Sequence, residues 1–172
     1  HADPTIILIH RNPLEVWKSL EHRNRFAKQK ALALWEIYML QAFQNIKGLS
    51  VFSLGYENLL GQPLLWLNKV RSFLQQQGFE FTKEIEEEAI KDFLTTDLHH
   101  WNYSDTDFLE SSDIPNSQKE LFQTLQNMPE YTDHFTIPEI TFNKEDKVLC
   151  LTNFLEKINF AEDIQIQKNI VI

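Results

Sequence analysis

The chain has 172 residues, of which 42% are hydrophobic and 12% aromatic, and its formal net charge at pH 7 is −9. This length and composition are those of a single globular domain with a substantial core, and they exclude a disordered chain. The acidic balance excludes a nucleic-acid binder with a broad basic face, and no apolar run approaches the roughly 20 residues that span a bilayer. The single cysteine, Cys150, cannot form an internal disulfide, and its isolation is typical of a cytoplasmic protein.

The chain opens on a short apolar strand that turns directly into a helix. The uninterrupted run T-I-I-L-I at residues 5–9 predicts a strand buried on both faces of a parallel sheet. Asn12 suits the N-cap of the helix that follows, and Pro13 suits its first position. Such a turn offers free backbone N–H groups and the positive end of the helix dipole to an anion, with Arg11 beside them. Ser19 lies about 9 Å further along the helix axis, so Arg11 and Ser19 are both within reach of one phosphate group.

A second helix and strand follow in the same order. Apolar residues recur every three or four positions over residues 26–47, which predicts an amphipathic helix, and Gly48 is placed to end it in a left-handed conformation. Residues 49–54 predict a second strand, and Tyr56 follows it closely. Because ligands bind at the carboxyl ends of strands in open α/β sheets, we expect Arg11 and Tyr56 to meet at one edge of one sheet.

These features resemble the core of PAPS-dependent sulfotransferases. Arg-Asn-Pro, followed by a serine eight positions after the arginine, is similar to the family's segment that binds the 3′-phosphate of the nucleotide. The family's later features occur in the same order, at residues 56–60 (Tyr-Glu-Asn-Leu-Leu, ending a strand), 62–63 (Gln-Pro) and 72–74 (Ser-Phe-Leu, ending a helix). The resemblance covers roughly residues 3–104.

The resemblance implies a helix-rich α/β fold with a parallel, P-loop-like sheet. Residues 1–172 would form one sulfotransferase-like domain, in which residues 105–172 are a C-terminal extension of unassigned role. By the same resemblance, Arg11 and Ser19 bind the 3′-phosphate, and Tyr56 lies near the adenine. PAPS or PAP would then be the co-substrate, no metal would be needed, and the acceptor would be a small molecule, a glycan or a lipid.

The chain also departs from the family pattern. The family's other phosphate-binding loop, of the Pro-Lys-Ser/Ala-Gly-Thr-Thr type, should precede Arg11, yet no glycine occurs before Gly48. The family's catalytic histidine or glutamate usually lies upstream as well, and His1 is too close to Arg11 to be that residue. We therefore expect a fold that is incomplete at its N-terminus, supplies the 3′-phosphate-binding half of the site and does not catalyse alone. The catalytic residue and the oligomeric state stay open.

Simpler interpretations of the same residues are also open. Arg11 alone is compatible with a structural ion pair at a strand end, Ser19 with a solvent-facing serine, and Tyr56 with a core residue. For the whole chain, the alternative is a non-catalytic binding or scaffold domain that has kept the fold and lost the nucleotide site. Residues 1–30 carry six Lys/Arg against three Asp/Glu, and this local excess favours a small anionic ligand.

The remaining two thirds of the chain predict more helices. The adjacent histidines His99 and His100 lack the spacing of metal ligands, and no cysteine accompanies them. The expected elements are a helix over 63–77 stopped by Gly78, a helix over 82–94 capped by Thr82, a loop over 97–113, a short helix with a capping box at Ser117 and Glu120, an extended segment over 135–142, a last helix from Asn143, and a strand or tail over 163–172.

Overall fold

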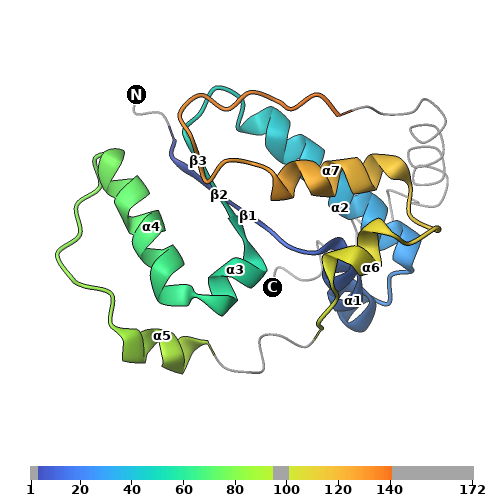
Figure 1. Ribbon diagram of the computed structural model, residues 1–172, viewed down its shortest axis with the longest axis horizontal. Coiled ribbons are helices and arrows are strands. Elements are labelled where there is room, and N and C mark those ends of the chain that lie inside the picture. The colour runs from blue at the N-terminus through green and yellow to red at the C-terminus, as the bar shows by residue number, and fades with distance from the viewer. Residues whose placement is uncertain (1–3, 95–100, 141–172) are drawn as a thin grey trace, which may run out of the picture.

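The computed structural model describes residues 4–94 and 101–140, which form a helix-rich α/β fold around a small mixed sheet (Figure 1). Its three strands are β1 (Ile6–His10), β2 (Val51–Gly55) and β3 (Tyr131–Thr132), in the order β1-β2-β3. β1 and β2 are parallel, with Ile6 opposite Val51 and His10 opposite Gly55, whereas β3 pairs with β2 in the antiparallel sense. The predicted α/β class and the parallel pair of strands are therefore confirmed.

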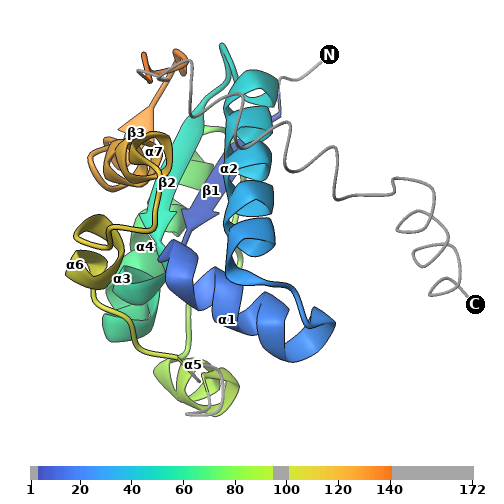
Figure 2. The same cartoon turned by 90° about the vertical axis from the view of Figure 1, so that its right-hand side faces the viewer.

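Helices pack on both faces of this sheet. In the view of Figure 2, α2 lies to the right of the strands and α1 below it, whereas α6 and α7 lie to the left. In Figure 1, α3, α4 and α5 lie together on the other side of the molecule. The helices are α1 (Pro13–Asn24), α2 (Lys28–Asn45), α3 (Tyr56–Gly61), α4 (Pro63–Gln76), α5 (Glu87–Phe93), α6 (Asp105–Leu109) and α7 (Asn116–Gln126). The helix predicted to begin at Pro13 corresponds to α1, and those predicted over 26–47 and 63–77 correspond to α2 and α4.

Two apolar clusters hold the sheet between its helices. The larger cluster joins α2, α7 and one face of the sheet, and Trp35 meets the rings of Phe108 and Phe122 edge-on at 6.0 and 6.4 Å between ring centroids. The smaller one packs Phe52 and Leu54 of β2 against α4, chiefly against Phe73. Gly48 follows α2 with φ of +80°, as the sequence predicts.

The prediction that the first strand is buried on both faces is wrong for the described residues. Leu8 is buried, but Ile7 and Ile9 are 39% and 48% exposed. The reason is the position of β1 at the edge of the sheet: the smaller cluster against α4 is built on Phe52 and Leu54 of β2, not on β1. An uninterrupted apolar run therefore does not here indicate burial on both faces.

Two helix starts differ from the prediction. The expected capping box at Ser117 and Glu120 does not form, because α7 begins at Asn116 after Pro115 and the Ser117 hydroxyl is buried in its first turn. A capping box does form at Ser104, whose hydroxyl accepts from the Asp107 backbone N–H while the Asp107 side chain accepts from the Ser104 N–H. It opens α6 inside the segment that was expected to be a loop.

Other boundaries also shift. Tyr56 begins the short helix α3 rather than ending a strand, and Thr82 caps nothing, since α5 starts at Glu87. Residues 135–140 form no regular element, and the third strand lies at Tyr131–Thr132 instead. The predictions for His99, His100, Cys150, the helix from Asn143 and the segment 163–172 lie outside the described residues.

Candidate functional site

Asn12 fixes the start of α1 at the carboxyl end of β1. Its side chain is 2% exposed, and its Oδ1 accepts from the Leu14 backbone N–H at 3.0 Å. Its Nδ2 group faces the carbonyl oxygens of Tyr103 and Ser104 at 3.4 and 3.2 Å and the Asp105 carboxylate at 3.2 Å. The predicted N-cap at Asn12 and the helix start at Pro13 are thus confirmed, and the same side chain ties residues 103–105 across the helix end.

This capping closes the backbone anion site that the sequence predicts. Pro13 has no N–H, and the Leu14 N–H is taken by the Asn12 side chain. The Glu15 N–H bonds the Asn12 carbonyl oxygen at 3.0 Å, and Asn12, Pro13 and Leu14 are buried. The expectation of free N–H groups at this helix end is therefore wrong, and anion binding here has to rely on side chains.

Arg11 lies between a buried carboxylate and an aromatic ring. Its Nε bonds Glu15 Oε2 at 2.6 Å, and its Cζ lies 4.5 Å from the centroid of the Tyr56 ring. Glu15 is fully buried, and its second oxygen accepts from the Tyr103 backbone N–H at 3.3 Å. The pairing of His10 with Gly55 places the next residues side by side, which confirms that Arg11 and Tyr56 meet at one edge of the sheet.

The ion pair leaves most of the guanidinium donors available. An arginine carries five N–H donors, and the bond to Glu15 uses the one on Nε. Within residues 4–94 and 101–140, no protein acceptor bonds the two terminal Nη groups, and the side chain is partly exposed. Arg11 is therefore both a structural ion pair and a fork that can still bind an anion through two parallel hydrogen bonds.

Ser19 lies on the same face of α1. It follows Glu15 by four residues, the spacing at which helix side chains are neighbours, and it is exposed. No hydrogen bond links it to Arg11 or Tyr56 in the described structure, so its role in binding a phosphate stays a prediction.

The surrounding lysines have structural partners. Lys18 pairs with Glu21 at 2.8 Å, and Lys28 pairs with Asp113 at 2.9 Å. Lys28 therefore forms an ordinary surface ion pair. These contacts reduce the local excess of positive charge that the sequence indicates, which leaves Arg11 as the principal candidate for binding an anion at the strand ends.

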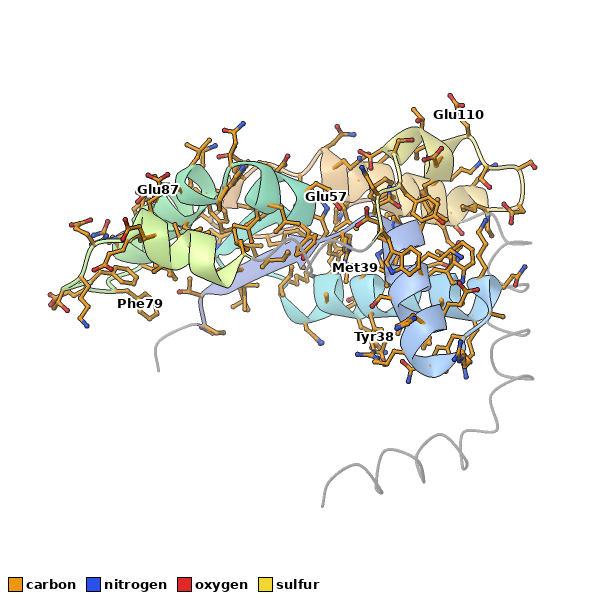
Figure 3. The ribbon with its side chains drawn as sticks, turned by 90° about the horizontal axis from the view of Figure 1, so that it is seen from below. Tyr38, Met39, Glu57, Phe79, Glu87 and Glu110 are labelled. Atoms are coloured by element: carbon orange, nitrogen blue, oxygen red, sulfur yellow. The ribbon has the colours of Figure 1, made fainter. Side chains whose placement is uncertain are left out.

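A pocket of about 460 Å³ opens beside Arg11, at the same strand ends. His10 and Glu57, the chain neighbours of Arg11 and Tyr56, both line it; Figure 3 shows Glu57 near the middle of the molecule. Other lining residues are Ser53, Trp66, Asp105 and Phe122. Sequence analysis did not single out this pocket, although the positions of His10 and Glu57 next to the predicted site residues were available as a signal.

Two ionisable groups in this pocket have shifted pKa values. Burial lowers the pKa of His10 below its usual 6.5, and the nearby Asp105 carboxylate opposes this shift. Burial raises the pKa of Glu57, and the Glu15 carboxylate adds to the rise, while backbone N–H groups and Arg11 oppose it. Glu57 is exposed as a whole residue, so solvent limits the effect.

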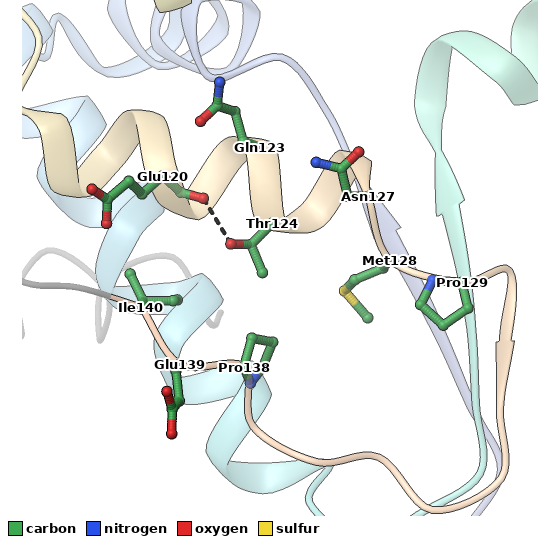
Figure 4. Close-up of a pocket in the computed structure, with 9 residues that line it drawn as sticks. All are labelled: Glu120, Gln123, Thr124, Asn127, Met128, Pro129, Pro138, Glu139 and Ile140. Carbon is green, nitrogen blue, oxygen red and sulfur yellow. Dashed lines mark hydrogen bonds between the residues drawn. The ribbon is translucent and has the colours of Figure 1, made fainter.

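A second pocket of about 460 Å³ lies between α7 and residues 138–140 and shares Met128 with the first (Figure 4). The Thr124 hydroxyl there already donates to the Glu120 carbonyl oxygen at 2.7 Å. Its lining includes Met128, two prolines and two glutamates but no histidine and no cation. The pocket at the strand ends is therefore the better candidate for chemistry.

Neither the grouping of metal-binding residues nor comparison with known proteins identifies the ligand of this site. In the described part of the chain, no three His, Cys, Asp or Glu residues are grouped to hold a metal ion, and no helix there is long and apolar enough to cross a membrane. Comparison with models of protein families, with curated proteins and with solved structures gave no match.

The capping side chain has a predicted stability effect. We expect Asn12→Ala to lower the free energy of unfolding by about 2 kcal/mol, because it removes a helix cap and a buried amide that bonds residues 103–105. Urea unfolding followed by circular dichroism measures this. Asn24→Ala, at the exposed far end of α1, is the control and should change stability by less than about 0.5 kcal/mol. Equal effects of the two substitutions would contradict the role given to Asn12.

The lowered pKa of His10 predicts a pH dependence of stability. Between the folded-state pKa and the ordinary value of 6.5, the unfolded chain binds more protons, so stability falls as pH falls through this range. We expect His10→Asn to lose less stability than the wild type between about pH 7.5 and pH 5.5. Asp105, Glu57 and Glu130 face the same pocket and are present in both proteins, so the difference between the two curves isolates His10. Parallel curves would refute the shift.

Proposed function

We propose that this chain supplies the 3′-phosphate-binding part of a PAPS-dependent sulfotransferase. The observation that carries the proposal is the guanidinium of Arg11, held between the Glu15 carboxylate and the Tyr56 ring at the carboxyl ends of two paired parallel strands. This position at the edge of a parallel sheet is where open α/β folds bind nucleotides. The P-loop-like character of the fold belongs to the same proposal.

Each residue has a distinct part in the proposed site. Arg11 binds the 3′-phosphate through its two Nη groups, since Nε is already committed to Glu15. Ser19 adds a hydroxyl donor one helical turn beyond Glu15. Tyr56 acts first as the platform that orients the guanidinium, and its contact with the adenine is a further part of the proposal.

The proposed chemistry is transfer of the sulfuryl group of PAPS to an acceptor. Residues that hold the 3′-phosphate do not touch the reacting sulfur; they supply binding energy from a remote part of the substrate and orient it. This role needs a rigid support, and the buried Glu15 carboxylate provides one, because its two oxygens are bonded to Arg11 and to the Tyr103 backbone.

The alternative is a non-catalytic binding domain. It is favoured by two observations: the helix end beside Arg11 has no open backbone N–H groups, and Glu15 neutralises the arginine that would bind the anion. The two functions differ in one measurable property, which is whether the chain distinguishes a nucleotide with a 3′-phosphate from one without it.

Calorimetric titration tests the proposal. We expect the wild type to bind PAP more tightly than AMP, which lacks the 3′-phosphate. The double variant Arg11→Gln/Glu15→Gln should weaken PAP binding about tenfold or more, the effect of losing a charged hydrogen-bonding partner, and should abolish the preference over AMP. Both charges are removed together because Arg11→Gln alone would leave the buried Glu15 carboxylate without its cation.

A matched control is Arg23→Gln, which removes an exposed arginine from the other end of α1. Its PAP affinity should stay within about twofold of the wild type, because exposed charges far from a site are screened by salt. Failure of the wild type to bind PAP, or equal binding of PAP and AMP, would overturn the proposal and favour the non-catalytic domain.

A further inference from the structure

Two carboxylates of the pocket at the strand ends are not held in ion pairs among the described residues, although Arg11 lies close enough to lower the pKa of Glu57. Neither Glu57 nor Asp105 forms an ion pair in the described part of the chain, whereas Glu130 pairs with Lys69 at 2.7 Å. Asp105 instead accepts from the side-chain amides of Asn12 and Gln126. No lysine or arginine lines the pocket, and burial keeps His10 largely neutral at pH 7. A ligand that complements these charges is a cation.

A second, independent feature is a buried hydroxyl without a partner. Ser53 is 5% exposed and lines the pocket, and its Oγ has no hydrogen-bond partner among the described residues. It alternates along β2 with Phe52 and Leu54, which pack against α4, so its side chain points to the opposite face, where the pocket and α7 lie. Buried polar groups are nearly always hydrogen-bonded. The Ser53 hydroxyl is therefore placed to bond a molecule in the pocket.

The shape of the pocket restricts the ligand to a small molecule with an apolar part. Its volume of about 460 Å³ is within the range of small-molecule sites. Trp66 and Phe122 line it with aromatic rings that can pack against an apolar body, and Lys69 Nζ already lies over the Trp66 ring, 4.2 Å from its centroid. Gly55 also lines the pocket, and a side chain there would crowd its neighbours, because a Cβ would lie 3.2 Å from the Asn58 amide nitrogen and 3.6 Å from the His10 ring.

We propose that this pocket binds a small organic molecule that carries a protonated amine next to an aromatic or aliphatic body. The ammonium group would lie between Glu57 and Asp105, the Ser53 hydroxyl would bond a polar group of the ligand, and the apolar body would pack on Trp66 and Phe122. In the proposed sulfotransferase this molecule is the acceptor, and that assignment of its role rests on the proposed function.

An NMR titration with phenethylamine as the probe tests the site. We expect the Gly55 amide and the Trp66 indole N–H signals to shift with phenethylamine, and much less with phenethyl alcohol or phenylacetate, which have the same ring without the positive charge. Glu57→Gln and Ser53→Ala should each weaken phenethylamine binding, the former about tenfold or more because it removes a charged partner. The preference for the amine should shrink as salt is raised.

Two controls distinguish a loss of binding from a loss of folding. Ser53→Ala removes a buried hydroxyl that has no partner, so it should not lower the melting temperature while it weakens binding. Glu110→Gln removes an exposed carboxylate that does not line the pocket and should leave phenethylamine binding unchanged; Figure 3 labels both Glu57 and Glu110. Equal binding of the amine and the alcohol, or unchanged binding in both Glu57→Gln and Ser53→Ala, would overturn the proposal.

The amine site and the nucleotide site can fail separately. PAP titrated into Ser53→Ala reports on the nucleotide site alone, because this substitution leaves Arg11, Glu15 and Tyr56 in place. If PAP does not bind but phenethylamine binds with the expected selectivity, the amine site is supported and its role as an acceptor site is refuted. If PAP binds and phenethylamine shows no selectivity, the amine site is refuted and the nucleotide site stands.

Discussion

The buried carboxylate of Glu15 is the interaction on which the carboxyl edge of the sheet depends. It lies in the first turn of α1, fully buried, and its two oxygens bond the Arg11 guanidinium and the Tyr103 backbone N–H. A buried charge is tolerated only when it is paired and hydrogen-bonded. Glu15 therefore holds Arg11 against Tyr56 on one side and draws residues 103–105 toward α1 on the other, where Asn12 completes the attachment.

The same strand ends carry groups of opposite charge. The last residues of β1 and β2 are paired, so the residues that follow them lie side by side. Arg11 and Tyr56 stack together, while their chain neighbours His10 and Glu57 line the pocket with Asp105. One step along the chain therefore separates the cationic group from the acidic pocket.

The parts predicted from sequence depend on local chemistry, and the parts missed depend on contacts between distant segments. Asn12 and Pro13 define the helix start by themselves, and the parallel strands follow from two short apolar runs, so the meeting of Arg11 and Tyr56 was predictable. The absence of free N–H groups at the start of α1 was not predictable, because the Asn12 amide also bonds residues more than 90 positions away. The exposure of Ile9 and the pocket around Ser53 likewise depend on which helices cover the sheet.

The closeness of the two sites has an electrostatic consequence for any anion that binds Arg11. Glu15 already offsets the arginine, and the carboxylates of Glu57 and Asp105, which form no ion pair with the described residues, add negative potential beside it. Like charges at one site repel, and solvent weakens this repulsion because Glu57 and Asp105 are exposed. A cation in the pocket would cancel this repulsion, and the coupling is reciprocal, so an anion on Arg11 would strengthen binding of the cation by the same factor. Opposed charges at one sheet edge thus favour joint occupation by an anionic and a cationic ligand over binding of either alone.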